Sequence, residues 1–336
     1  MAKAKPKSIA DIARLAGVSK TTVSRALNDS PFINVETKKR VQSIIKAHAF
    51  QPSAMARNLS RRRSCTVGFV THAYAKDGCG GITDPFSVEI MGSIAAGLHK
   101  LGYDLLTIIV DHHNSEWPAQ FLDSSRVDGF IIMTSTGKRH DVELLLDRGA
   151  PFVAWGMGNG EYCTVCGDDV GGGRLATERL LSLGRERIGF IGGPKVESEV
   201  QGRYRGFEAA LRAAGKEPDP ALVVYGDYSE ESGARGMAEL LKRAPGLDAV
   251  FCNSDLMAIA AMRTLAAAGR QVPRDVAVVG YDNVSVSSYV TPSLTTVSQN
   301  IPLAGKFLAE DFVGCLVQRT VTNRIVPVEL VVRASA

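Results

Sequence analysis

The stretch of sequence that decides the fold runs Ile9-Ala-Asp-Ile-Ala-Arg-Leu-Ala-Gly-Val-Ser-Lys-Thr-Thr-Val-Ser-Arg-Ala-Leu-Asn28. Ser8 precedes it, and Asp11 follows Ser8 at the three-residue spacing of a capping box, which predicts a helix start. Apolar residues then recur at helical spacing as far as Gly17. Glycine takes positive φ without strain, so Gly17 is expected to end this first helix.

Two more helices are predicted after the first. Ser19 is suited to cap a short helix over Lys20 to Leu27, and a third helix is expected over Val35 to His48. This third helix is expected to leave Lys38, Lys39 and Arg40 toward solvent. Small residues at the crossing allow the first two helices to pack closely, which is typical of a helix-turn-helix. The first fifty residues therefore predict an all-α head of the kind that binds DNA.

The beginning of the second helix carries side chains that can read DNA. Lys20 and Thr21 are expected to face base edges in the major groove, with Arg25 one turn later. Arginine can bond guanine through two hydrogen bonds, and threonine can contact a thymine methyl. Nearby polar residues suit phosphates, which set the register of binding; they are Ser19, Thr22, Ser24 and Asn28. For Thr22 and Ser24 the alternative is ordinary helix surface.

The charge of the chain is unevenly distributed. Residues 1–64 contain 14 basic and 3 acidic side chains, a net charge of +11, whereas the remainder contains 25 basic and 32 acidic side chains, a net charge of −7. A compact basic head on an acidic body favours binding of a polyanion by the head. The alternative is a basic solubilising tail, but this head is also patterned to fold.

Composition excludes several classes of protein. A length of 336 residues suggests about two domains, and 45% hydrophobic residues allow a substantial core. There is no apolar run of about 18 residues and no apolar signal core behind the basic N-terminus, so a cytoplasmic protein is expected. Six cysteines are too few for a disulfide scaffold.

A short segment, Gln51-Pro-Ser-Ala-Met-Ala-Arg-Asn-Leu-Ser60, comes after the head. Pro52 ends the preceding element, and Ser53 can cap a new helix. The helix-prone stretch from Ala54 to Leu59 is shorter than the ~12 residues that an isolated helix needs. We expect it to be ordered only when DNA and a symmetry-related copy hold it, so residues 51–64 are predicted to form a hinge.

From Cys65 onward, apolar strand-like runs alternate with helical patterns. This alternation predicts parallel sheets covered by helices on both faces, and about 270 residues favour two sheets over one. Ligands in such folds bind at the carboxyl ends of strands. Strands are expected at 66–70, 104–110, 129–133, 152–155, 188–191, 222–225, 249–252, 276–280 and 325–332.

The stretch from Ile9 to Asn28 closely resembles the DNA-binding head of the lactose-repressor (LacI) family of bacterial transcription factors, and the resemblance continues through nearly the whole chain. It implies base reading at Lys20, Thr21 and Arg25. It also implies that two hinge helices enter the minor groove together, with Ala56 and Leu59 among the DNA contacts and Leu59 opening the central base step. For the body it implies a fold similar to periplasmic sugar-binding proteins, with two lobes and a ligand cleft between them.

The same resemblance, together with the strand ends, yields candidate effector-binding residues. Arg203 matches the ligand-binding arginine of the family, while Gln201 stands where another arginine is usual. Asn253 and Asp282 each follow a predicted strand and can bond vicinal hydroxyls. The remaining candidates are Asp84, Phe86, Trp155, Tyr228 and Gln299. Alternatives stay open: helix capping for Asp84, core packing for Phe86, loop capping for Asn253 and Asp282, and a hinge role for Gln299.

Enzyme functions find little support. Cys163 and Cys166 lack a second ligand pair for a metal, and the chain has no phosphate-binding Gly-Lys-Ser/Thr motif and no nucleophile elbow. We therefore expect no catalytic residues, no metal and no cofactor. A sugar-transport binding protein is the main rival, and the basic head and missing signal peptide count against it.

The prediction is thus an all-α helix-turn-helix head joined to an α/β two-lobed, periplasmic-binding-protein-like effector domain. Boundaries are expected at 1–50 for the head, 51–64 for the hinge and 65–336 for the body. The first lobe is expected over about 65–166 and 295–320, and the second over about 167–294 and 321–336.

The expected function is a repressor that binds a pseudo-palindromic operator and is released by a small sugar. It is expected to be a homodimer, because one recognition helix has too few base contacts to select a site alone. The alternative is a regulator that a purine or other metabolite activates as corepressor.

Overall fold

A computed structural model gives the fold of the chain. It describes residues 6, 8–27, 29–50, 63–72, 82, 84–110, 114–133, 139–318 and 320–336. The chain divides into two compact units, Met1–Ser64 and Cys65–Ala336, which we call the head and the body.

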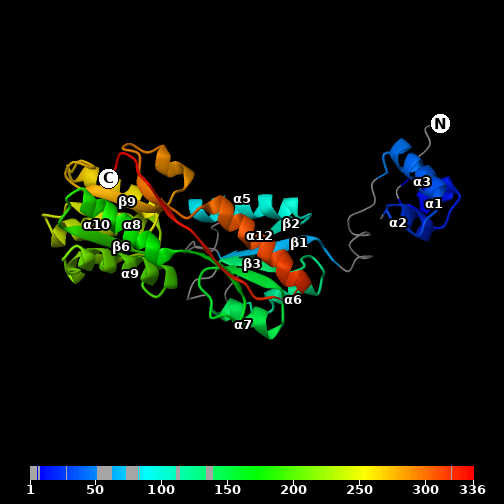
Figure 1. Ribbon diagram of the computed structural model, residues 1–336, viewed down its shortest axis with the longest axis horizontal. Helices are drawn as coiled ribbons and strands as arrows, with labels where there is room; N and C mark the ends of the chain where they lie inside the picture. Colours follow the sequence, from blue (N-terminus) through cyan, green and yellow to red (C-terminus); the bar gives the residue numbers. More distant parts are fainter. Residues whose placement is uncertain are drawn as a thin grey trace. The chain divides into compact units, whose positions relative to one another are not determined.

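The described residues of the head form three helices (Figure 1). They are α1 (Ile9–Ala16), α2 (Lys20–Leu27) and α3 (Val35–Ala47). The capping box of Ser8 and Asp11 is present, and Gly17 ends α1 with a φ of 63°, as predicted. The core contains Ile12, Ala13, Ala16, Val23, Ala26, Val41 and Phe50.

The first lobe of the body is built on a six-stranded sheet in the order β11-β5-β4-β3-β1-β2. Its strands are β1 (Thr66–His72), β2 (Asp104–Val110), β3 (Phe130–Met133), β4 (Phe152–Trp155), β5 (Cys163–Gly167) and β11 (Asn323–Val326). Its helices are α5 (Pro85–Lys100), α6 (Trp117–Leu122), α7 (Arg139–Asp147) and α12 (Ile301–Gln318). Helices α5 and α12 lie side by side on one face of the sheet (Figure 1).

The second lobe is built on a six-stranded sheet in the order β12-β10-β9-β8-β6-β7. Its strands are β6 (Ile188–Gly192), β7 (Val223–Tyr225), β8 (Ala249–Cys252), β9 (Ala277–Asp282), β10 (Thr295–Ser298) and β12 (Glu329–Val331). Its helices are α8 (Asp169–Ser182), α9 (Ser198–Ala213), α10 (Glu230–Arg243) and α11 (Asp255–Ala267). Strand β12 pairs antiparallel with β10, and the other pairings between described strands are parallel.

The predicted head and two-lobed α/β body are confirmed, but the order of the last strands is not as expected. Residues 295–298 belong to the second lobe because β10 pairs with β9, and residues 323–326 belong to the first lobe because β11 pairs with β5. The single strand expected over 325–332 is two short strands in different sheets. Pro327 comes directly after β11 and cannot donate a backbone hydrogen bond, which favours an interruption there.

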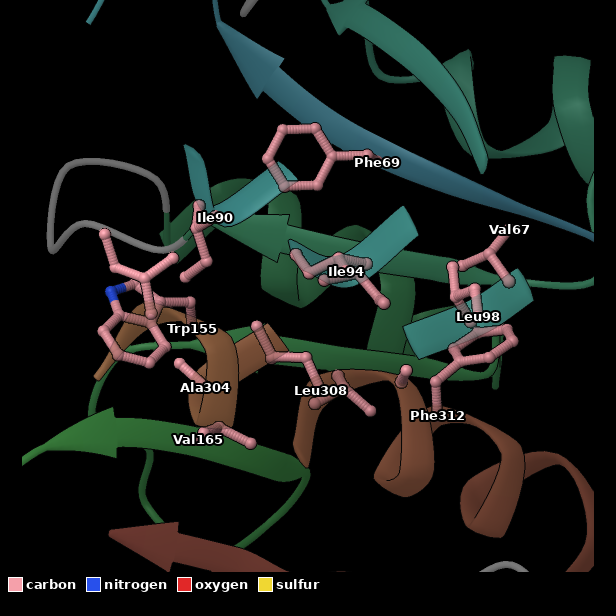
Figure 2. Packing of buried hydrophobic residues seen from close by; sticks show 14 of the residues in the cluster. Val67, Phe69, Ile90, Ile94, Leu98, Trp155, Val165, Ala304, Leu308 and Phe312 are labelled. Atoms are coloured by element: carbon pink, nitrogen blue, oxygen red, sulfur yellow. The ribbon is translucent and has the colours of Figure 1, made fainter. Parts of the chain in front are cut away.

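Each sheet is covered by apolar residues on both faces. In the first lobe, Ile90, Ile94 and Leu98 of α5 meet Leu308 and Phe312 of α12 over the sheet (Figure 2). In the second lobe, α8 and α9 cover one face and α10 and α11 cover the other. Two layers of helix on a parallel sheet leave the strand ends as the part of each lobe that the helices do not cover.

In the part of the chain that the structure describes, no helix combines the length and the apolar character needed to span a membrane.

Candidate functional site

The exposed face of α2 carries the predicted base-reading side chains. Lys20, Thr21 and Arg25 are exposed, while Val23 and Ala26 turn into the core of the head. Among the described residues, neither Lys20 nor Arg25 takes part in an ion pair, so both charges face solvent. This arrangement leaves two cations and a hydroxyl free to contact a nucleic acid.

Ser19 and Thr22 hold the start of α2. The Ser19 hydroxyl accepts a hydrogen bond from the backbone N–H of Thr22 at 3.1 Å, and the two hydroxyls lie 2.9 Å apart. Ser19 therefore caps α2 as expected. Three predicted DNA contacts, Asn28, Ala56 and Leu59, lie outside the described residues.

The basic side chains of α3 differ from the expectation in one respect. Lys38, expected in solvent, lies 2.9 Å from a carboxylate oxygen of Asp29. The turn after α2 brings the aspartate to the first turns of α3, and the unlike charges pair. Lys39 and Arg40 are exposed, as predicted.

In the body, five predicted effector residues gather at the carboxyl ends of the strands of the second lobe. Tyr228, Asn253, Asp282 and Gln299 follow or end β7, β8, β9 and β10, and Arg203 lies on α9. Parallel strands place their carboxyl ends on one edge of the sheet, which explains why residues far apart in sequence meet there. Arg203, Asn253, Asp282 and Gln299 are buried.

Arg203 is held by contacts within the protein. Its Nε donates to Asp169 at 2.9 Å, and its Nη1 donates to the backbone oxygen of Asn253 at 2.7 Å. Its guanidinium carbon lies 3.8 Å from the centre of the Tyr281 ring. These contacts fix the plane of the guanidinium, and its positive charge is paired with a carboxylate of the same protein.

Several buried polar atoms at this edge have no partner among the described residues. They are the hydroxyl of Tyr228, both polar atoms of the Asn253 side chain, and Oε1 of Gln299. A buried polar group without a hydrogen bond costs about 1–3 kcal/mol, so such groups are rare unless something else binds them. Together they offer donors and acceptors to a ligand.

Asp282 connects this group of residues to the first lobe. Its Oδ1 accepts a hydrogen bond from Nε2 of Gln299 at 2.7 Å. Burial raises the pKa of Asp282 well above its ordinary value; Arg203 opposes the rise, and the carboxylates of Asp255 and Asp84 add to it. Asp84 lies in the first lobe, so its charge reaches Asp282 across the lobe boundary.

The first lobe contributes a carboxylate and two rings. Asp84 caps α5 by accepting from the backbone N–H of Ser87 at 2.8 Å, which is the alternative role considered for it. Phe86 and Trp155 lie with ring centres 5.8 Å apart at an angle of 48°. Trp155 ends β4, and both rings adjoin the apolar core of this lobe.

Sequence reasoning missed several residues that shape the site. Asp169 and Tyr281 hold Arg203, and no local pattern pairs them with an arginine so distant in sequence. Gly193 gives room to Tyr228, since a Cβ atom there would lie 2.3 Å from the tyrosine ring. Gln201, which replaces the usual arginine, donates to the backbone oxygens of Lys195 and Val196 at 3.3 and 3.5 Å and so supports the loop after β6.

Comparison with known families matches both units. Residues 8–53 match the family described as bacterial regulatory proteins, lacI family, and residues 177–336 match the periplasmic binding protein-like domain. The chain is 37% identical over 328 residues to the HTH-type transcriptional regulator CelR of Thermobifida fusca, covering 95% of this chain and 94% of CelR. It is 33% identical over 299 residues to the HTH-type transcriptional repressor PurR of Photorhabdus laumondii, covering 87% and 85% of the two chains.

Solved structures agree with these matches. A complex of the transcriptional regulator CelR with cellobiose has a TM-score of 0.75 at 34% identity and covers 98% of this chain and 100% of that one. The lac repressor dimer bound to operator and the anti-inducer ONPF has a TM-score of 0.84 at 25% identity and covers 98% and 99%.

Proposed function

Because this chain belongs to the lacI family of bacterial regulatory proteins, we propose that it represses transcription by binding an operator and that an uncharged sugar releases it. The observation that carries the sugar assignment is the set of unpartnered, uncharged polar atoms on Tyr228, Asn253 and Gln299. Sugar hydroxyls both donate and accept hydrogen bonds, which matches a site that offers donors and acceptors together.

The charges at the site support a neutral ligand. Arg203, which contacts the backbone of Asn253 at this edge, is already bound to Asp169 and to the backbone oxygen of Asn253. Asp282 and Asp84 present carboxylates to the same space. Among the described residues of this edge, no cation is free to offset the charge of a phosphorylated sugar.

Cellobiose is the first effector to test, since the CelR structure is a complex with cellobiose. In the first lobe, the rings of Phe86, at the start of α5, and Trp155, at the end of β4, lie 5.8 Å apart and are proposed as the apolar side of the site. The apolar face of a glucose unit suits such a surface, while its hydroxyls suit the polar side.

Operator binding is assigned to the exposed face of α2, in a dimer. One copy presents Lys20, Thr21 and Arg25, which is too little contact to select a genomic site. Two copies related by two-fold symmetry double the contacts and require an inverted repeat in the DNA. The lac repressor structure that this chain resembles is a dimer on its operator.

Release depends on the position of β1. This strand begins at Thr66, directly after the predicted hinge, so a movement of the first lobe acts on the hinge without an intervening element. A sugar that favours one arrangement of the lobes then lowers operator affinity by a coupling free energy of about 1–3 kcal/mol.

The test uses the full chain and an operator fragment selected by the protein from random-sequence DNA. Thermal unfolding is monitored with cellobiose, glucose, glucose 6-phosphate and a purine base, and operator affinity is then measured with each. We expect cellobiose to raise the unfolding temperature and to weaken operator binding. A purine that raises the unfolding temperature and tightens operator binding would instead establish the corepressor alternative.

A further inference from the structure

A short segment of the second lobe contacts the first lobe at the edge of the candidate site. This segment, Asp282–Ser285, begins where β9 ends, and the chain returns from it to β10 of the same sheet. We call it the crossing segment because its contacts span the two lobes. Asp282 has a φ of 112° and Asn283 has a φ of 56°. Positive φ at two successive residues other than glycine is strained and persists only where surrounding contacts hold it.

The second lobe holds the segment mainly through Asp255. This residue begins α11 and is fully buried. Its Oδ2 accepts a hydrogen bond from the backbone N–H of Val284 at 2.9 Å, and its Oδ1 accepts one from the hydroxyl of Thr296. Arg333 adds a second anchor, because its Nη2 donates to Oδ1 of Asn283 at 2.6 Å.

The first lobe holds the other end of the segment. The backbone N–H of Ser285 donates to Oε1 of Glu89, on α5, at 2.8 Å. The side chain of Val284 is 2% exposed and belongs to the buried apolar cluster of the first lobe, together with Ile90 and Ile301. Val284 is thus bound to the second lobe by its backbone and to the first lobe by its side chain.

A carboxylate as buried as that of Asp255 reduces the stability of the fold. Burial raises its pKa to about 7, against the opposing hydrogen bonds from Thr296 and Val284 and the charge of Arg333. An apolar residue at the start of α11 would avoid this cost, so the contacts that Asp255 makes call for a functional explanation.

We propose that Asp255 is a positioning residue for the effector response, which fixes the crossing segment so that a ligand at Asp282 displaces Val284 and Ser285 and, through them, α5. This rests on the proposed sugar site and goes beyond it, because it assigns the element that carries the signal between the lobes. Asp255 itself need not touch the ligand.

The first test needs no effector. Hydrogen exchange is measured on the full chain for Asp255→Ala, Asp255→Asn and Asp275→Ala. Asp275 is the matched control, since it also accepts a backbone hydrogen bond in the second lobe, from Gln271 at 2.8 Å. We expect Asp255→Ala to speed exchange at Val284 and in the first turn of α5 about tenfold, the loss of one hydrogen bond.

Asp255→Asn should restore slow exchange, because its amide can accept from Val284 and donate to Thr296, and Asp275→Ala should leave both regions unchanged. Unchanged exchange in Asp255→Ala, or no rescue by asparagine, overturns the proposal. If Asp255→Ala does not fold, Glu89→Ala tests the other anchor at a half-buried position; unchanged exchange at Val284 and Ser285 then overturns it.

The second test measures operator affinity with and without cellobiose. We expect Asp255→Ala and Glu89→Ala to reduce the ratio of the two affinities toward one while cellobiose still binds, and Asp255→Asn to retain the wild-type ratio. A full response in Asp255→Ala contradicts the proposal. If the wild-type protein itself ignores cellobiose, the proposed effector is wrong, and the exchange experiment decides the role of Asp255 without it.

Discussion

Asn253 offers a sharp test of the site, because its side chain is buried yet bonded to nothing in the described protein. Both of its polar side-chain atoms lack a partner, while its backbone oxygen accepts from Arg203 and its backbone N–H donates to Ile191. The substitution Asn253→Ala keeps both backbone contacts. It removes only the amide group that we assign to the ligand.

The expected free energies derive from this geometry. An unpartnered buried polar group costs about 1–3 kcal/mol, so its removal offsets the loss of packing and leaves the free energy of unfolding within about 1 kcal/mol of wild type. A ligand loses two hydrogen bonds worth about 0.5–1.5 kcal/mol each. The dissociation constant for cellobiose should therefore rise roughly 5- to 150-fold.

Thr295→Val is the matched control. Thr295 is equally buried in the second lobe, but its hydroxyl donates to the oxygen of Ala336 at 3.0 Å and accepts from the N–H of Arg333 at 2.9 Å. Removing the hydroxyl leaves the buried oxygen of Ala336 and the part-buried N–H of Arg333 without this partner. The free energy of unfolding should therefore fall by about 1–3 kcal/mol, while cellobiose affinity stays at the wild-type value.

Urea unfolding and calorimetric titration with cellobiose measure both quantities on the full chain. The assignment of Asn253 would be refuted by an alanine variant that binds cellobiose as tightly as wild type. A loss of more than about 3 kcal/mol of stability would show instead that the amide serves the core.

The remaining predictions concern the head, the loop after β6 and the ionisation of Asp255. Arg25→Ala should weaken operator binding by about 1–3 kcal/mol and relax base choice, whereas Lys39→Ala should lower affinity for operator and random DNA alike; equal losses on both DNAs for Arg25→Ala would contradict its base-reading role. Gly193→Ala should push the Tyr228 ring from its place and weaken cellobiose binding without unfolding the body, which titration and thermal unfolding together check. Because burial raises the pKa of Asp255 from 3.8 to about 7, the folded state keeps a proton that the unfolded state releases between these values. The stability of wild type should therefore fall, relative to Asp255→Asn, as pH rises from 4 to 7; a difference between the two proteins that does not change with pH would count against it.

The sequence predicted those features that depend on local pattern. Ser8, Gly17 and Ser19 mark helix ends because capping chemistry acts within a few residues, and Asn253 and Asp282 were found because each follows an apolar strand. Whether a given side chain at such a position binds a ligand is a property of the tertiary structure. That the side chain of Asn253 has no partner among the described residues is visible only once the strands are assembled.

Contacts between segments far apart in the chain could not be predicted from the sequence. Strand length and hydrophobicity do not say which neighbour a strand chooses, so residues 295–298 and 323–326 were placed in the wrong lobes. The ion pairs of Arg203 with Asp169 and of Lys38 with Asp29 likewise form only when the fold brings the two side chains together. Crossing contacts such as that of Glu89 with Ser285 join residues nearly two hundred positions apart, and no periodicity encodes them.

The order of the last strands also determines when each sheet can be completed during synthesis of the chain. The sheet of the first lobe lacks an edge until residues 323–326 have left the ribosome, and the sheet of the second lobe lacks one until residues 329–331 have emerged as well. The head, with its own small core, is complete by residue 50. Because chains fold from the N-terminus as they emerge, each new molecule carries a folded head for most of its translation while neither lobe is finished. A chain whose synthesis stops before residue 323 would therefore have a complete head but an incomplete sheet in each lobe.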